Sequence, residues 1–240
     1  MGLLQFFAKP LALLLSWLYG FVQNYGLSLI IITVVVKLCL YPLYEKQMKS
    51  SMKMTELQPK IKELQQKYAN DRSLMQQKIM ELQKQEGASA TGGCLPMLIQ
   101  MLVIFGLFAL LRNPMLYFDA DGEMLFAIHE PFLWIKDLAQ PDKWILPILS
   151  GIATFIASIL NQSTTSATAG NAQQAAVMTK YMKYVFPVMI LWLARTYPAG
   201  LAIYWFGSQV MQIFFNIRFN KVRKQLQEQK NAGKKKKVKA

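Results

Sequence analysis

The sequence is poor in the residues that carry enzyme chemistry. Its 240 residues include one histidine, His129, and two cysteines, Cys39 and Cys94. Metal sites usually need three or four His, Cys or carboxylate ligands at short spacing, and the sequence has no such group. A glycine-rich phosphate loop and a nucleophile elbow are absent as well. Both cysteines lie in apolar runs, which indicates neither a disulfide framework nor a redox motif. We therefore expect no enzyme, no metal and no cofactor.

Charged residues are also scarce, and most of them are basic. They make up 17% of the chain, against about 25% in typical proteins. Lys and Arg number 27 and Asp and Glu 13, which gives a net charge of +14. The 53% hydrophobic content excludes a disordered chain. The apolar residues are concentrated in long uncharged runs, which argues against a soluble nucleic-acid-binding protein. The composition therefore predicts a membrane protein.

Apolar runs long enough to cross a bilayer recur along the chain. A spanning helix needs about 20 apolar residues, and four runs qualify directly. A fifth, Tyr184–Ala194, is short and spans if Lys183 and Arg195 extend toward the interfaces and the bilayer thins. We predict an all-α integral membrane protein with an interfacial amphipathic helix (1–24), transmembrane helices (25–44, 93–113, 143–161, 180–195 and 198–218), a cytoplasmic helical hairpin (45–90), an extracytoplasmic loop (114–142), a cytoplasmic loop (162–179) and a basic cytoplasmic tail (219–240).

The first segment has two other interpretations. As a signal peptide it would carry Lys9 ahead of the apolar run rather than inside it, and a small-residue cleavage site would follow. As a sixth span it would place Lys9 near mid-membrane at considerable cost. Trp17 and Tyr19 suit the headgroup zone, so we favour a helix that lies in the interface.

The distribution of basic residues predicts the orientation. With five spans, residues 45–93, 161–183 and 218–240 share one side and hold 21 of the 27 Lys and Arg. The positive-inside rule puts this side in the cytoplasm and the N-terminus outside. The last residues include Lys234–Lys237, and such a charge run is typical of a solvated, disordered end. It can also attract anionic lipids or RNA phosphates.

The first cytoplasmic segment has helical periodicity on both sides of an Asn70–Asp71 turn. Two apolar stripes result, formed by Met48, Met52, Leu57, Ile61, Leu64 and Tyr68 before the turn and by Leu74, Met75, Ile79 and Leu82 after it. We expect an antiparallel hairpin in which the stripes cover each other. A sharper alternative is that Met48, Met52 and Met54 offer an adaptable surface to apolar segments of other proteins.

Lys37 is the most informative residue of the sequence. It lies near the middle of a predicted span, where a charge costs about 2.5–3.5 kcal/mol, and no predicted span contains a carboxylate to pair with it. We therefore expect Lys37 to face a water-filled cavity. Polar residues of this and other spans are candidates to line it: Thr33, Gln100, Ser158, Ser208 and Gln209. Such a cavity suits a polar or acidic passenger segment, and it equally suits a small-solute or anion transporter or channel.

Several motifs occur in one order on this five-span plan. They are Ile30–Thr33 with a basic residue four positions later, Tyr41–Leu43, Leu57–Ile61, Gly92–Pro96, Leu98–Met101, Trp134–Leu138, Ile145–Leu149, Pro198–Leu201 and Tyr204–Trp205. On these residues the chain resembles the YidC/Oxa/Alb family of membrane protein insertases, and closely resembles the core of its bacterial members. The resemblance runs from about Phe6 to Arg218.

The resemblance implies a multi-pass protein of the bacterial cytoplasmic membrane. Its five spans would enclose a hydrophilic groove that is open to the cytoplasm and to lipid. A nascent membrane protein would place a polar or acidic segment in the groove. The implied partners are nascent membrane proteins, the ribosome, the Sec translocon in some cases, and anionic lipids at the basic tail, with no small-molecule substrate. A transporter would instead predict inverted repeats, and none is visible.

The resemblance also implies the groove residues. Lys37 occupies the position where the family usually has Arg, and Thr33 precedes it by one turn. Gln100 matches a polar position on the second span, while Ser158 falls where some members have Gln. The aromatic pair Tyr204 and Trp205 matches positions that flank the family's substrate path. For Trp205, ordinary packing or interface anchoring is the competing interpretation.

Overall fold

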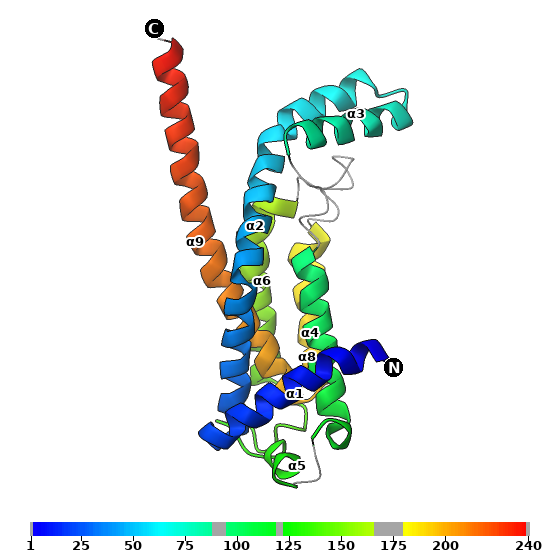
Figure 1. The fold of residues 1–240 in the computed structure, drawn as a ribbon, viewed down its shortest axis with the longest axis vertical. Coiled ribbons are helices and arrows are strands. Elements are labelled where there is room, and N and C mark those ends of the chain that lie inside the picture. The colour runs from blue at the N-terminus through cyan, green and yellow to red at the C-terminus, as the bar shows by residue number, and fades with distance from the viewer. Residues whose placement is uncertain (1, 88–94, 119–121, 166–179, 239–240) are drawn as a thin grey trace.

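The computed structural model describes residues 2–87, 95–118, 122–165 and 180–238, and the regular structure of these ranges is helical (Figure 1). An isolated bridge between Phe132 and Ile135 is the one strand-like pairing in the same ranges. The elements are α1 (Gly2–Val22), α2 (Tyr25–Lys67), α3 (Arg72–Gln85), α4 (Leu95–Arg112), the 3-10 turn η2 (Pro114–Leu116), α5 (Glu123–Ala127), α6 (Ile145–Thr165), the π-helical turn η3 (Tyr181–Val185), α8 (Phe186–Ala194) and α9 (Ala199–Val238).

Helix α2 joins two regions that the sequence analysis treats separately. It begins at the Asn24 cap, whose side-chain oxygen accepts a hydrogen bond from Leu27 N, and runs for 43 residues. At about 1.5 Å per residue it is about 65 Å long. The predicted first span and the first arm of the predicted hairpin are thus one uninterrupted helix. Among the described residues, α2 is the helix long and apolar enough to cross a membrane, while the other apolar helical stretches (8–22, 98–112, 145–161 and 181–194) are shorter.

The helices pack into one bundle with two distinct ends. Helix α6 packs against α8 and α9, α2 packs against α9, and α1 packs against α4 and α2 (Figure 1). The far halves of α2 and α9 and helix α3 extend from one end, which we call the hairpin end. Helices α1 and α5 and the loop after α5 lie at the other, which we call the loop end. The apolar core extends from the bundle into this loop end through residues such as Phe118, Met124, Ile128 and Leu138.

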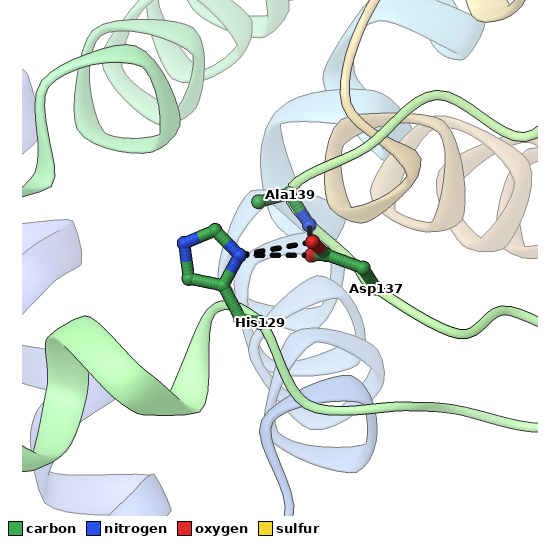
Figure 2. A network of polar contacts seen from close by, with 3 residues as sticks. All are labelled: His129, Asp137 and Ala139. Atoms are coloured by element: carbon green, nitrogen blue, oxygen red, sulfur yellow. Dashed lines mark hydrogen bonds and ion pairs between the residues drawn. The ribbon is translucent and has the colours of Figure 1, made fainter.

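Carboxylates fasten the segments of the loop end to one another. Glu130 accepts a hydrogen bond from the Tyr19 hydroxyl of α1 and another, of 2.9 Å, from the Tyr25 backbone N–H at the start of α2. The bond to Glu130 is the main reason why the pKa of Tyr19 rises to about 12. Asp137 lies 3.0 Å from His129 Nδ1 and accepts a hydrogen bond of 2.8 Å from Ala139 N (Figure 2).

The predicted hairpin is present, but one residue of its predicted apolar stripe, Leu74, is not part of the buried contact. The Asp71 carboxylate caps α3 by accepting hydrogen bonds from Ser73 N and Leu74 N. Residues of both helices form a buried seam of Met54, Leu57, Ile61, Met75 and Ile79, with Leu64, Tyr68 and Leu82 packed against it. Leu74 is outside this seam and 36% exposed, because it belongs to the capping turn.

The methionines do not form one adaptable surface. Met54 is buried in the seam, whereas Met48 packs against an aromatic cluster of Tyr44, Phe215 and Phe219 between α2 and α9. The two apolar stripes therefore largely cover each other, as the simpler interpretation predicted.

The basic tail differs from its sequence expectation. Helix α9 continues without a break from Ala199 in the bundle to Val238, instead of ending in a disordered segment. Most residues of this tail are Lys, Arg, Gln or Glu, which are good helix formers, so the helix that leaves the bundle can continue. The predicted cytoplasmic loop lies largely outside the described residues, since α6 extends to Thr165 and the next described residue is Lys180.

Candidate functional site

Lys37 lies inside the bundle, and its contacts are polar but uncharged. Lys37 is 3% exposed to solvent. The ammonium Nζ donates to the Tyr44 hydroxyl at 3.2 Å and to Gln100 Oε1 at 3.1 Å. It also lies 5.2 Å from the centre of the Tyr44 ring, within range of a cation–π contact. Among the described residues, no carboxylate pairs with this cation.

The site joins three helices that are distant in sequence. Gln100 on α4 turns its oxygen to Lys37 on α2, and its Nε2 donates to the Tyr204 hydroxyl of α9 at 3.0 Å. Tyr204 is fully buried. We call Lys37, Tyr44, Gln100 and Tyr204 the lysine cluster.

Tyr44 is the member of the lysine cluster that the sequence analysis missed. It follows Lys37 by seven positions, which places both side chains on one face of a helix. The signal was therefore present in the sequence. The predicted span ends at residue 44, where a tyrosine is equally expected as an interface anchor. For this reason Tyr44 was not predicted as a site residue.

The other predicted site residues lie apart from the lysine cluster. Thr33 bonds to the Leu29 carbonyl at 2.6 Å and packs where Gly207 lets α9 come close. Ser158 bonds to the Phe155 carbonyl of its own helix at 2.8 Å. Trp205 donates from Nε1 to Thr154 Oγ1 at 3.0 Å, which ties α9 to α6. Three of the six predicted residues (Lys37, Gln100 and Tyr204) are thus brought together.

Lys37 is buried in the structure, whereas the sequence predicted that it faces a water-filled cavity inside the bundle. Tyr44 and Gln100 supply the polar contacts of the ammonium, and Tyr204 bonds to Gln100 behind them. Two hollows of the described residues lie elsewhere. One is lined by Phe108, Arg112, Tyr197 and their neighbours at the loop end, and the other lies between α6 and α9 at the hairpin end. Lys37 lines neither of these hollows, and the hydrophilic groove beside it stays a prediction.

The lysine cluster has the chemistry of an anion-accepting site. An ammonium has three N–H donors, and the described contacts of Lys37 occupy two of them with neutral oxygens. A carboxylate acceptor would add the attraction between opposite charges to the hydrogen bond. The described residues contain no group of three or more His, Cys, Asp or Glu that could hold a metal ion.

A bundle of apolar helices around a buried, carboxylate-free cation is the architecture of a membrane protein that handles a polar ligand or passenger. Comparison with known proteins gives the family. Residues 17–228 match the family model described as the 60Kd inner membrane protein. The chain belongs to this family, the YidC/Oxa family of membrane protein insertases, as its motifs predicted.

The relatives differ in how much of their length is matched. The membrane protein insertase YidC of Wolinella succinogenes is 39% identical over 92% of this chain and 38% of its own length. That of Fusobacterium nucleatum is 37% identical over 85% of this chain and 89% of its own length. The chain thus spans less than half of some relatives and most of others.

A solved structure supports the fold. An active YidC insertase, determined by crystallography with its first transmembrane domain resolved, has a TM-score of 0.59 and 27% sequence identity to this chain. The match covers 87% of this chain and 45% of that one. The all-helical fold therefore agrees with the sequence prediction. The description of the family model agrees with the predicted inner membrane location.

Proposed function

We propose that this chain inserts nascent membrane proteins into the bacterial cytoplasmic membrane, and that the lysine cluster receives a polar or acidic segment of the passenger. The carrying observation is that, within the described residues, the acceptors of the buried Lys37 ammonium are neutral and lie at 3.1 and 3.2 Å. A lysine that served structure alone would be expected to have a carboxylate partner. Lys37 instead retains the capacity to bind an anion.

The membrane arrangement we propose has five spans. They are the first half of α2, α4, α6, η3 with α8, and the first half of α9, while α1 lies in the outer interface. The hairpin end then faces the cytoplasm. Two observations support this: the hairpin and the far half of α9 extend from the same end, and the predicted cytoplasmic segments hold 21 of the 27 basic residues.

The enclosure of Lys37 defines how a passenger must enter. A passenger carboxylate would displace Gln100 Oε1 or take the remaining N–H of the ammonium, so α4 must move relative to α2 at the cytoplasmic side. The hydrophilic groove forms in this step. The span formed by η3 and α8 is 14 residues, which cover about 21 Å of the roughly 30 Å hydrocarbon core. Local thinning at this helix would shorten the apolar path for the passenger.

No nucleotide is needed for this cycle. The membrane potential favours outward movement of an acidic segment by about 2.3 kcal/mol per charge per 100 mV. Burial of the passenger's own apolar helix in lipid then completes insertion. The ribosome would approach the hairpin and the tail, and the chain would work alone or beside the Sec translocon.

The direct test is insertion by the purified chain in liposomes that lack the Sec translocon. A single-span protein with a short acidic external tail is synthesised in their presence, and protease protection measures translocation. We expect protection that depends on the chain and falls with Lys37→Ala or with a passenger lacking acidic residues. Protection no higher than in empty liposomes, together with uptake of small anions, would favour the transporter that the same lysine permits.

A further inference from the structure

A second polar site lies at the hairpin end of α9, about four helical turns beyond Tyr204 along the chain. A hollow of about 530 Å³ opens there between α6 and α9. Its lining combines aliphatic, amide and basic side chains, which are Leu160, Ile217, Asn220, Lys221, Arg223 and Lys224. The lysine cluster contributes nothing to this lining, so the two sites are separate.

The position of the hollow matches a membrane boundary. Ile217, Lys221 and Lys224 lie on one face of α9 because they are four and three residues apart. Lys221 follows the start of α9 at Ala199 by about 33 Å of helix, while a hydrocarbon core is about 30 Å thick. In the proposed arrangement, Ile217 is therefore level with acyl chains and the basic residues are level with lipid phosphates.

The neighbouring contacts hold this face against α6. Asn220 Nδ2 donates to the Leu160 carbonyl at 3.3 Å, and one turn earlier Asn216 Nδ2 donates to the Ala157 carbonyl at 3.4 Å. Asn216 is buried. These bonds fix the register of α9 on α6 and keep the basic side chains at the rim of the hollow.

The cations of this hollow have no anionic partner within the described ranges. Lysines of the hairpin region such as Lys49, Lys60 and Lys78 pair with carboxylates at 2.7 or 2.8 Å. Lys221, Arg223 and Lys224 form no ion pair with any described residue. Three basic residues around one hollow create a strong local field for an anion.

We infer that this hollow binds one anionic phospholipid, with its phosphate held by Lys221, Arg223 and Lys224 and an acyl chain lying on Leu160 and Ile217. The inference rests on the proposed membrane arrangement. RNA offers the same phosphate chemistry, but it would leave the aliphatic part of the lining uncovered. A phospholipid fits both parts of the lining and explains why they adjoin at this depth.

The test measures bound lipid rather than insertion, so its result is independent of the proposed insertase activity. The full chain is purified in micelles containing equal amounts of dioleoyl phosphatidylglycerol and dioleoyl phosphatidylcholine, and retained lipids are counted by native mass spectrometry. We expect the wild type to retain one phosphatidylglycerol in preference to phosphatidylcholine. The variant Lys221→Gln/Arg223→Gln/Lys224→Gln should lose this preference by at least about fivefold, the effect of a single basic residue near a surface.

Two further variants separate a built site from general attraction. Lys234→Gln/Lys235→Gln/Lys236→Gln removes the same charge farther along the tail and should retain the preference. Leu160→Trp fills the hollow without changing charge and should weaken retention, with thermal unfolding checking that it folds. An equal loss of preference in the tail control would overturn the site. Lipid retention as in the wild type by both the first triple variant and Leu160→Trp would overturn it as well. Loss of ribosome co-sedimentation with unchanged lipid retention in the first triple variant would assign these residues to RNA instead.

Discussion

The loop end and the lysine cluster treat charge in opposite ways. At the loop end each carboxylate discussed above has several partners: Glu130 binds two helices, and Asp137 binds a histidine and a backbone N–H. In the lysine cluster the partners of a buried cation, among the residues that the structure describes, are neutral. The first arrangement uses charge to fasten segments, whereas the second leaves a charge able to bind something further.

The packing around these two regions differs in the same sense. A continuous apolar core fills the loop end. The Phe132 ring there lies so close to the α2 backbone that an added Cβ on Gly26 would be 2.3 Å from Phe132 Cγ. The lysine cluster depends on side-chain hydrogen bonds that a ligand can replace. We infer that the bundle is closed firmly at the loop end and opens from the hairpin end.

The largest expected effect comes from removing the unpaired cation. Lys37→Met should lower insertion of an acidic passenger by about tenfold to a hundredfold, because a hydrogen bond to a charged group contributes about 1.5–3 kcal/mol. Thermal unfolding should show no loss of stability, since a buried charge without a counter-ion is removed. Protease protection and unfolding of the same preparation test both points.

Two matched variants accompany this experiment. Lys46→Met removes one exposed lysine of the same helix and should insert normally. Lys37→Arg keeps the charge and should retain function; an inactive Lys37→Arg protein would contradict a role for charge alone.

A carboxylate placed inside the lysine cluster should pair with Lys37, so that the cluster, like the loop end, has its charge bound within the protein. Gln100→Glu would pair with Lys37 across the present 3.1 Å contact. We expect insertion of acidic passengers to fall about tenfold, while passengers without acidic residues are affected little. Gln100→Leu removes the acceptor without adding charge and should keep the preference for acidic passengers. An unchanged charge preference in Gln100→Glu would contradict the proposed exchange.

The close packing of the loop end can be disturbed without touching charge. Gly26→Ala should lower the free energy of unfolding by about 1–3 kcal/mol, because the new methyl group overlaps the Phe132 ring. Gly20→Ala is the matched control, since no atom lies within 4 Å of its added Cβ and alanine favours helix by up to about 1 kcal/mol. Denaturation in micelles distinguishes them, and similar stabilities would show that this end tolerates rearrangement.

The smallest effects should come from one hydroxyl removed in each region. Tyr19→Phe loses a bond to the Glu130 carboxylate and should cost about 1.5 kcal/mol of stability without altering passenger preference. Tyr44→Phe loses an acceptor of the Lys37 ammonium and should cost about 1.5 kcal/mol and change the preference for acidic passengers. A shift of preference in Tyr19→Phe alone would reverse the assignment of roles.

The Tyr19 contribution also has a direction with pH. The folded-state pKa of Tyr19 is about 12, above its ordinary value of 10.0. The stability from this bond is therefore complete below about pH 10 and is lost as the pH rises through about 12. Unfolding curves of the wild type and Tyr19→Phe should converge over this interval.

The helical bundle, the hairpin and the cost of placing Lys37 among apolar residues were predictable from the sequence. Long uncharged runs leave helices as the solution that satisfies the backbone in a membrane. Apolar stripes at helical spacing imply a partner, and Asp71 marks the turn between them. A lysine among apolar residues is costly wherever it folds, so its significance does not depend on knowing its neighbours.

The tertiary structure alone decided which polar residues act together. Gln100 and Tyr204 are 104 positions apart and become partners because α4 and α9 meet beside α2. Thr33 shares a helix face with Lys37, yet its hydroxyl bonds to its own backbone. Periodicity assigns a residue to a face of its helix, but the contact between faces of different helices depends on packing throughout the bundle. The enclosure of Lys37 follows from that packing as well.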